Sequence, residues 1–301
     1  MRLAAYALLP LVLLVTLIVC AGLLGYGLLQ VAGDLQPLDK IIGRTTQILL
    51  VLSIFPLKKI LQLSWKDLGF APRAVFLKQL FQGLLLALVT LLPVLLTLYG
   101  LDVHVFDDTR AWTAAKIAEK VGLGLLLALL IALFEEILFR GLLLTGLRRK
   151  MPLLAAIVIS SFYYASLHFL KSSTSIPYSE LTWTSGMQLM AEAFGNWLNP
   201  AITSASIALF VVGVFLAVLR SRIPQSLGFC IGCHCGWVWQ ITVSKDLFNV
   251  NPQSGYLFLV SDYDGVIGPL VSFWLALAIL GFSLLSKKWN GLSTKSRAII
   301  Y

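Results

Sequence analysis

Apolar stretches close to the length of a membrane-spanning helix recur from one end of this chain to the other. About 20 apolar residues cross the hydrocarbon core of a bilayer as a helix, which satisfies its own backbone hydrogen bonds there. With 58% hydrophobic and 12% charged residues, the composition is not that of a soluble domain. The chain is therefore predicted to be all-α, a polytopic transmembrane helical bundle of about eight spans. The expected spans are residues 3–31, 41–57, 77–98, 121–147, 152–170, 202–219, 227–241 and 268–285.

Basic residues gather in alternate connections between these spans. They follow the second, fourth and sixth spans and recur in the tail, whereas the other connections are acidic or nearly neutral. Because positively charged loops stay in the cytoplasm, both termini are predicted to be cytoplasmic. A net charge of +9 would suggest nucleic acid as the partner of a soluble protein, but this placement points to the membrane, and no nucleic-acid partner is expected. The basic residues of these three connections and the tail are Lys58, Lys59, Lys66, Arg73, Lys78, Arg148, Arg149, Lys150, Arg220, Arg222, Lys287, Lys288, Lys295 and Arg297.

The first span is predicted to be retained rather than removed. It is longer than the apolar region of a signal peptide and has no small-x-small cleavage site. The longest connections, residues 102–120, 171–200 and 242–267, are all predicted to lie outside. The first of these mixes apolar and charged residues in a way typical of a helix that lies along the membrane interface.

Two adjacent carboxylates and an arginine interrupt the fourth apolar run. Glu135, Glu136 and Arg140 lie between Val121 and Leu147, where each charge costs at least roughly 2.5–3.5 kcal/mol. On a helix Glu136 and Arg140 are four residues apart and can pair, which offsets part of this cost. Glu135 falls on a neighbouring face without a local counter-ion, so it is a candidate proton acceptor. A purely structural role for the Glu136–Arg140 pair is the alternative.

Two of the three histidines fall inside predicted spans. His168 lies in the fifth span with Tyr164 four residues before it on the same helix face, and His234 lies in the seventh. A carboxylate and two imidazoles that converge in a dry pocket can deprotonate a water and stabilise the oxyanion formed when it attacks a carbonyl. Hydrogen bonding between helices without any chemistry is the alternative for either histidine. The third, His104, lies among aspartates of an outer connection and is expected to be solvated.

These motifs, in this order, resemble the CPBP intramembrane proteases, which include type II CAAX prenyl endopeptidases and bacteriocin-processing enzymes. The most specific part is the run Phe134-Glu135-Glu136-Ile137-Leu138-Phe139-Arg140-Gly141, followed by the motifs of His168 and His234. The resemblance implies a catalytic core over residues 120–285. Residues 1–119 would hold three further spans and the interfacial segment, and residues 286–301 a basic cytoplasmic tail. It also implies a multi-pass protein of a bacterial cytoplasmic (inner) membrane.

The same resemblance implies a role for each residue of the motifs. Glu135 would activate a water together with His168, and His234 would help to hold the oxyanion. The site would be shaped by Glu136, Arg140 and Tyr164.

Two positions depart from the family pattern. Tyr164 stands where the family often has Phe, and Val238 stands where it often has Asn or Asp. Valine can neither donate a hydrogen bond nor bind a metal, which leaves the oxyanion to His234 or to a partner still to be identified. Zinc held by the Glu135, His168 and His234 side chains remains an alternative to a metal-free, glutamate-activated water. The resemblance favours the metal-free reaction, so no cofactor is expected.

Three thiols surround His234. Cys230 and Cys233 complete the C-x-x-C-H pattern of covalent haem attachment, and Cys235 follows directly. Haem attachment takes place on the outer, oxidising side, whereas this stretch begins a few residues beyond the cytoplasmic Arg222. A helix also spreads the three thiols over different faces, which does not make a tetrahedral zinc site. We expect no haem and interpret the thiols as small buried hydrophobic side chains.

The sequence thus predicts an intramembrane endopeptidase that hydrolyses a peptide bond of a membrane-anchored protein or peptide in the lipid bilayer. The reaction would remove a propeptide or sorting tail, or process the C-terminus in another way. An alternative from a different class is a non-catalytic transporter or scaffold that uses the buried Glu, Arg and His side chains as a proton relay or ligand site. The sequence shows no internal repeat and no matching pair of broken helices, which many transporters have.

Overall fold

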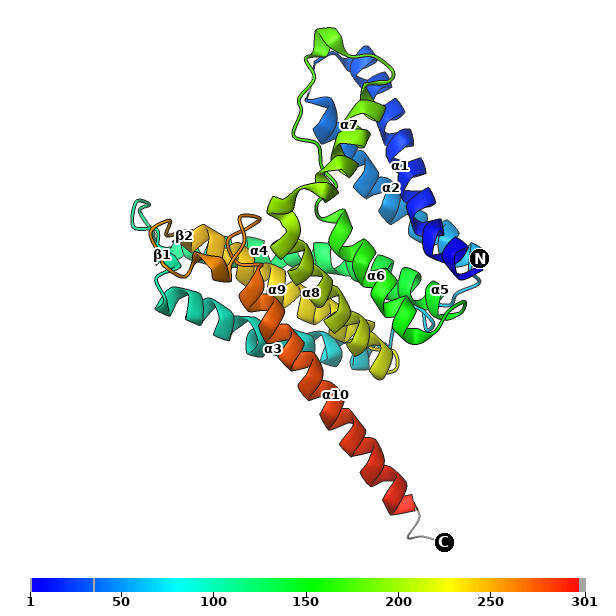
Figure 1. Ribbon diagram of the computed structural model, residues 1–301, viewed down its shortest axis with the longest axis vertical. Coiled ribbons are helices and arrows are strands. Elements are labelled where there is room, and N and C mark those ends of the chain that lie inside the picture. The colour runs from blue at the N-terminus through cyan, green and yellow to red at the C-terminus, as the bar shows by residue number, and fades with distance from the viewer. Residues whose placement is uncertain (1, 35, 298–301) are drawn as a thin grey trace.

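The computed structural model describes residues 2–34 and 36–297, and the side chains of residues 3–34 and 36–284. Within this range the chain is mostly helical and has only two short strands, as predicted for an all-α protein (Figure 1). A π-helix, η1 (Ile137–Leu143), joins α4 to α5 without a break, and α10 includes most of the expected tail. The helices are α1 (Arg2–Ala32), α2 (Leu38–Ile60), α3 (Arg73–Gly100), α4 (Ala114–Glu136), α5 (Leu144–Arg148), α6 (Leu153–Leu167), α7 (Ser185–Gly195), α8 (Thr203–Arg222), α9 (Leu227–Leu247) and α10 (Pro269–Arg297).

Every predicted span corresponds to a helix. The fourth span is α4, η1 and α5 in succession, and residues 114–120 of the expected interfacial segment form the first turns of α4. Among the described residues, five helical stretches are long and apolar enough to cross a membrane, whereas α6 and the apolar part of α10 are shorter. Helix α9 is not one of the five, because His234 and Gln240 lower its mean hydropathy. The number of spans therefore stays a prediction.

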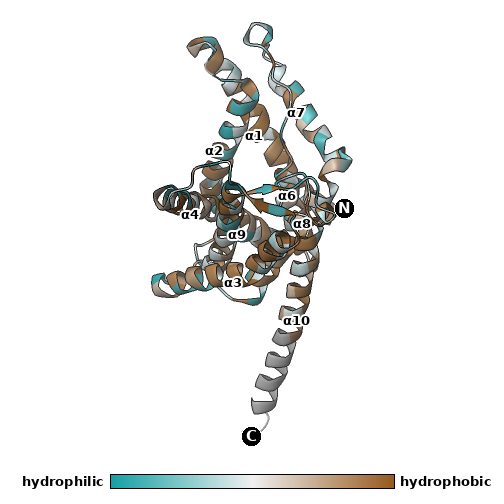
Figure 2. Cartoon of the chain, turned by 90° about the vertical axis from the view of Figure 1, so that its left-hand side faces the viewer, coloured by the Kyte–Doolittle hydropathy of each residue, from teal (hydrophilic) through white to brown (hydrophobic). Residues whose placement is uncertain are grey.

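Large apolar side chains cover the outside of the helices. Figure 2 shows hydrophobic residues over most of α1, α3 and α4. Leu24, Leu85 and Leu126, one on each of these helices, are 58%, 45% and 56% exposed. Soluble monomers rarely expose continuous apolar surface on this scale, whereas lipid is a favourable solvent for it. The chain is an integral membrane protein.

Glycines allow α9 to pack directly against α3. A Cβ atom on Gly232 would overlap the carbonyl oxygen of Leu80, and one on Gly83 would overlap the carbonyl oxygen of Phe229. Small residues at such crossings let two backbones approach closely, which is a main source of helix association in a membrane. Helix α4 also packs against α9. These contacts set the depth and rotation of His234 within the bundle.

The remaining helices form two groups. Helix α8 packs against α6 and α10, while α1, α2 and α7 form a group that rises away from the others (Figure 1). Helix α7 lies within residues 171–200, which were expected only as an outer connection. Its Gly186 meets Gly22 of α1 in direct backbone contact, so α7 is held against α1 rather than left in solvent.

Two outer connections meet in a short antiparallel ribbon. Strand β1 (His104–Phe106) pairs with β2 (Phe248–Val250), with His104 opposite Val250. The prediction that His104 is solvated is wrong. Its side chain is only 5% exposed, and Nε2 donates a hydrogen bond to the carbonyl oxygen of Gly265 at 2.7 Å. The ring is buried because connections far apart in the sequence fold onto each other, which the residues around His104 do not reveal.

Candidate active site

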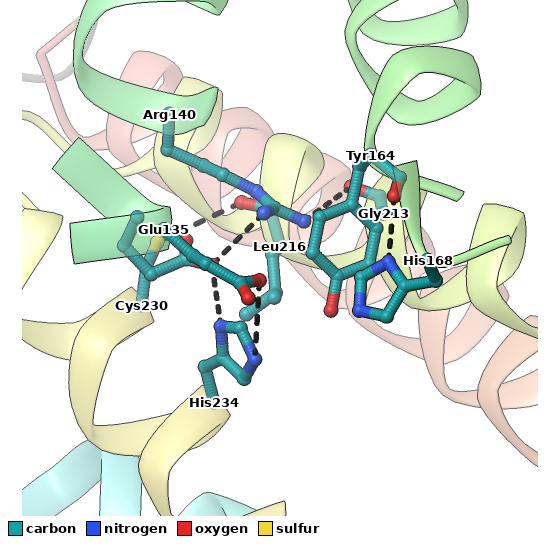
Figure 3. A network of polar contacts seen from close by, with 9 residues as sticks. Glu135, Arg140, Tyr164, His168, Gly213, Leu216, Cys230 and His234 are labelled. Carbon is teal, nitrogen blue, oxygen red and sulfur yellow. Dashed lines mark hydrogen bonds and ion pairs between the residues drawn. The ribbon is translucent and has the colours of Figure 1, made fainter. Parts of the chain in front are cut away.

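Three parts of the bundle carry the predicted site residues, and their side chains gather in one region (Figure 3). The end of α4 and the following η1 carry the two glutamates and the arginine, the C-terminal end of α6 carries the tyrosine and the first histidine, and α9 carries the second histidine. The wide turn of a π-helix often marks a functional site, and here it begins directly after the glutamates. The residues are Glu135, Glu136, Arg140, Tyr164, His168 and His234.

Glu136, Arg140 and His234 form a buried hydrogen-bonded cluster. Glu136 is 0% exposed and Arg140 is 2% exposed. The Arg140 guanidinium donates to Glu136 Oε1 at 2.9 Å, which confirms the predicted pair, and to the Gly213 carbonyl of α8 at 3.4 Å. It also lies 4.3 Å from the centre of the Tyr164 ring, a cation–π contact. Buried charges are tolerated when they are paired and hydrogen-bonded, and Arg140 meets both conditions.

The Nδ1 atom of His234 is hydrogen-bonded within this cluster. Nδ1 lies 2.8 Å from the Glu136 oxygen that also accepts from Arg140. Because a carboxylate paired with arginine acts as an acceptor, His234 donates its Nδ1–H to it. The ring can then donate from Nε2 only when both nitrogens carry a proton. Nε2 points toward Glu135 at 3.9 Å, beyond hydrogen-bond range.

Glu135 has different surroundings from its neighbour. Its side chain is 32% exposed, and its Oε2 atom has no hydrogen-bond partner among the described residues. It lines a cavity of about 610 Å³ bounded by parts of α1, α2, α4, η1, α6 and α7. An unpartnered carboxylate facing a cavity is available to accept a hydrogen bond from water or from a substrate.

His168 caps the C-terminal end of α6 and presents one free nitrogen. Its Nδ1 lies 2.8 Å from the carbonyl oxygen of Tyr164. A carbonyl only accepts, so Nδ1 carries the hydrogen, and Nε2 of the neutral ring has a lone pair. The backbone of α6 thus fixes the tautomer that a proton acceptor at Nε2 requires.

The Tyr164 ring lies close to both imidazoles. Its centre is 4.8 Å from that of His168 and 6.0 Å from that of His234. His168 shares the larger cavity with Glu135 and a smaller one, of about 200 Å³, with His234. His168 therefore shares one cavity with Glu135 and another with His234, but no hydrogen bond joins it to either residue among the described residues.

Comparison with known families matches residues 117–240 to the type II CAAX prenyl endopeptidase Rce1-like family. This segment is similar to that family. It runs from the first turns of α4 to Gln240 of α9 and contains all six predicted site residues. The match confirms the resemblance found in the sequence and supports intramembrane endopeptidase activity in general terms. No curated protein and no solved structure matches the chain.

Zinc held by Glu135, His168 and His234 is the alternative to a metal-free site. Within the part of the chain that the structure describes, no group of three or more His, Cys, Asp or Glu side chains is placed to hold a metal ion. Glu135 and His168 line the larger cavity, and His168 and His234 line the smaller one, so neither cavity brings all three side chains together.

The thiols beside His234 are free and buried, as predicted. Cys230 and Cys233 belong to the main apolar core, and Cys235 packs with a second cluster that includes residues of α2 and α4. The Sγ atom of Cys230 lies 3.6 Å from the carbonyl oxygen of Leu216. The thiols pack as small apolar side chains around the histidine.

Two residues that the sequence did not single out also reach the cavities. Tyr263, in the connection between β2 and α10, lines both of them, and Thr90 of α3 lines the smaller. The Thr90 hydroxyl accepts a hydrogen bond from Trp237 Nε1 at 2.8 Å. Neither residue belongs to a local sequence pattern that predicts a site. Each lies at the cavities because segments far apart in the chain pack together.

Proposed function

We propose that this protein is a membrane-embedded endopeptidase in which Glu135 activates a water molecule for attack on a peptide bond. One observation carries the proposal: the unpartnered Glu135 carboxylate and the His168 imidazole line the same cavity. The Rce1-like match supports the reaction class. The paired Glu136 and Arg140 would keep the end of α4 and the start of η1 in place beside this cavity.

In the proposed reaction the water oxygen bonds to the carbonyl carbon while one water proton passes to Glu135. The carbonyl π electrons move to their oxygen, which becomes an oxyanion. When the carbonyl re-forms, the carbon–nitrogen bond breaks with its electron pair on nitrogen, and Glu135 returns the proton to the leaving amine. The products are a carboxylic acid and an amine, so one water is consumed for each bond cleaved.

The two histidines would act on different atoms of this reaction. His168 would accept a hydrogen bond from the attacking water at Nε2 and orient it, since its Nδ1–H is held by the Tyr164 carbonyl. His234 would donate to the oxyanion from Nε2 when its ring carries both protons. Glu136 would keep that ring in position through Nδ1.

The larger cavity would admit the substrate. Apolar side chains of α1, α2 and α7 make up much of its lining, with Thr46 and Gln47 of α2 among the few polar ones. Because these helices face lipid, we propose a membrane-anchored protein or peptide as the substrate, reached from within a bacterial cytoplasmic membrane. A prenylated C-terminus, as in the family description, and a sorting tail or propeptide are the two forms that a test must distinguish.

Intact-mass proteomics of membrane proteins tests the proposal. Cells that lack the protein are compared with cells that express the wild type, Glu135→Ala, His168→Ala or Glu119→Ala, at matched membrane levels. Glu119 is an exposed glutamate near the start of α4 and serves as the matched control. We expect at least one precursor to persist in the null, Glu135→Ala and His168→Ala cells and to be processed in the other two.

Other outcomes of this comparison have definite meanings. Normal processing by Glu135→Ala would contradict the proposed mechanism. Unchanged masses in all strains would favour the transporter or scaffold. The mass lost from the precursor separates the two substrate forms, because removal of a short prenylated end and removal of a sorting tail or propeptide give different products. A zinc chelator should leave cleavage by membranes from the wild-type cells unchanged.

A further inference from the structure

The site described so far is poor in donors for an oxyanion. Tetrahedral intermediates of acyl transfer are stabilised by positioned hydrogen-bond donors, which often give the largest single contribution to catalysis. Among the residues of the motifs that line the smaller cavity, the donors are the Tyr164 hydroxyl and Nε2 of His234, because the Nδ1–H of His234 is held by Glu136. Val238, one helical turn further along α9, lines the same smaller cavity but has no donor.

Tyr263 lines both cavities and carries a hydroxyl. It lines the larger cavity with Glu135 and the smaller with His234, and His168 borders both. Its ring packs against Phe169, the residue after His168, with 5.0 Å between ring centres. Within the described residues its hydroxyl makes no hydrogen bond, so the donor is not already engaged. Tyr263 also lies outside the segment matched by the Rce1-like family.

The hydroxyl keeps its proton at neutral pH. Tyr263 is 37% exposed, and the burial of the rest of the residue raises its pKa to about 12, with the charges of Asp264 and Glu135 acting in the same direction. A group that stays protonated can donate a hydrogen bond to a developing negative charge without losing its proton.

The connection that carries Tyr263 is held in one conformation. Asp264 Oδ1 accepts from the backbone N–H groups of Val266 at 3.0 Å and Ile267 at 2.7 Å. Gly265 has φ +77°, a left-handed conformation that glycine adopts without strain, and its carbonyl accepts from buried His104. A donor held in place by such contacts needs little reorganisation during the reaction.

We propose that Tyr263 is a further catalytic residue, whose hydroxyl donates a hydrogen bond to the oxyanion formed at the scissile carbonyl. The inference rests on the proposed endopeptidase function and adds to it an oxyanion donor that lies outside α9. No proton leaves the phenol in this role. Tyr263 therefore contributes to the transition state and not to the deprotonation of water.

The test uses Tyr263→Phe in the full-length protein, reconstituted in proteoliposomes with a substrate found by the proteomic comparison. Tyr256→Phe is the matched control, since Tyr256 is a tyrosine of the same connection that lines neither cavity. We expect Tyr263→Phe to lower kcat by about 10²-fold with KM and Tm unchanged, as for loss of one oxyanion donor. Tyr256→Phe should match the wild type.

A second variant separates a lost donor from altered packing. Val238→Asn places an amide donor beside the same cavity, so Val238→Asn with Tyr263→Phe should recover part of kcat. The inference is overturned if Tyr263→Phe has the kcat of the control. It is also overturned if its loss of kcat comes with a lower Tm and Val238→Asn recovers none of it. If the wild type itself cleaves nothing, the endopeptidase proposal fails and the role of Tyr263 fails with it.

Discussion

Glu135 and Glu136 are adjacent in the chain, yet their carboxylates meet different surroundings. One step along an α-helix turns the side chain by about 100°, so two neighbours face different directions. Glu136 points into the bundle, where it accepts from Arg140 and His234. Glu135 lines a cavity, its side chain is 32% exposed against 0% for Glu136, and it makes no side-chain hydrogen bond among the described residues. We infer that Glu136 holds the structure and that Glu135 carries the chemistry.

This division predicts that the same Glu-to-Gln change lowers the stability of the protein at one of the two positions and not at the other. Glu136→Gln leaves the buried Arg140 without its counter-ion, and breaking a buried ion pair in this way costs about 3–5 kcal/mol of stability. We expect a clearly lower Tm in detergent and less folded protein in the membrane. Glu135→Gln removes a partly exposed, unbonded charge and should keep a Tm close to that of the wild type. Similar losses of Tm in both variants would contradict the division.

At the residue scale, the sequence revealed the groups whose chemistry is unusual for their surroundings. Glu135, Glu136 and Arg140 could be found because charge is costly in an apolar run. Tyr263 and His104 could not, because a tyrosine or histidine in an outer connection is common. Their importance comes from contacts with distant segments, such as the hydrogen bond from His104 to Gly265.

At the element scale, the crossing of α3 and α9 depends on the absence of side chains. Gly232→Ala would place a methyl group against the Leu80 carbonyl, and overpacking of this kind costs about 1–3 kcal/mol or more. We expect a lower Tm together with reduced cleavage, since α9 also carries His234. Gly122→Ala on α4 is the control, because a Cβ there meets nothing within 4 Å. Thermal unfolding of both variants in detergent checks this, and equal Tm values would show that the crossing tolerates a methyl group.

The segment before α7 is predicted to loosen in acid. Glu192 accepts hydrogen bonds from Ser172, Ser173 and Thr174, and those bonds lower its pKa from 4.5 to about 2. A lowered pKa in the folded state means that these bonds stabilise the segment above the ordinary pKa and are lost as the pH falls toward 2. A nitroxide attached through Ser175→Cys should become more mobile over this range. When Glu192→Gln is added, the mobility of the label should not change with pH. If the label is equally insensitive to pH in the protein that keeps Glu192, the proposed role of Glu192 is wrong.

Hydropathy located the helices of the bundle but not every helical feature. The π-helix after Glu136 has the same apolar composition as the α-helix that precedes it, so no pattern distinguishes the two. Helix α7 was missed because it is short, and its packing against α1 depends on the contact of Gly186 with Gly22. Such features depend on packing partners that lie far away in the sequence.

At the scale of the whole molecule, the distribution of charge predicts the orientation in the membrane. Lys150, after α5, should lie in the cytoplasm, and Glu180, before α7, should lie outside. Both residues are exposed, so an introduced cysteine can react at either position. In intact cells a membrane-impermeant maleimide should label Glu180→Cys but not Lys150→Cys. It should label Lys150→Cys only after the membrane has been opened. Among the native thiols, three are buried and Cys20 lies on the apolar helix α1, so the background should be low. The reverse labelling pattern would contradict the topology.

In the proposed reaction, Glu135 activates a water for hydrolysis of a peptide bond. The most direct measurement follows cleavage of the identified substrate by purified protein in proteoliposomes made up in oxygen-18 water, with wild type and Glu135→Gln compared by mass spectrometry. We expect one oxygen-18 atom in the new carboxyl group, and a rate lowered by about 10²–10⁴-fold in Glu135→Gln, as for loss of a general base. Cleavage by Glu135→Gln at the wild-type rate would contradict the account.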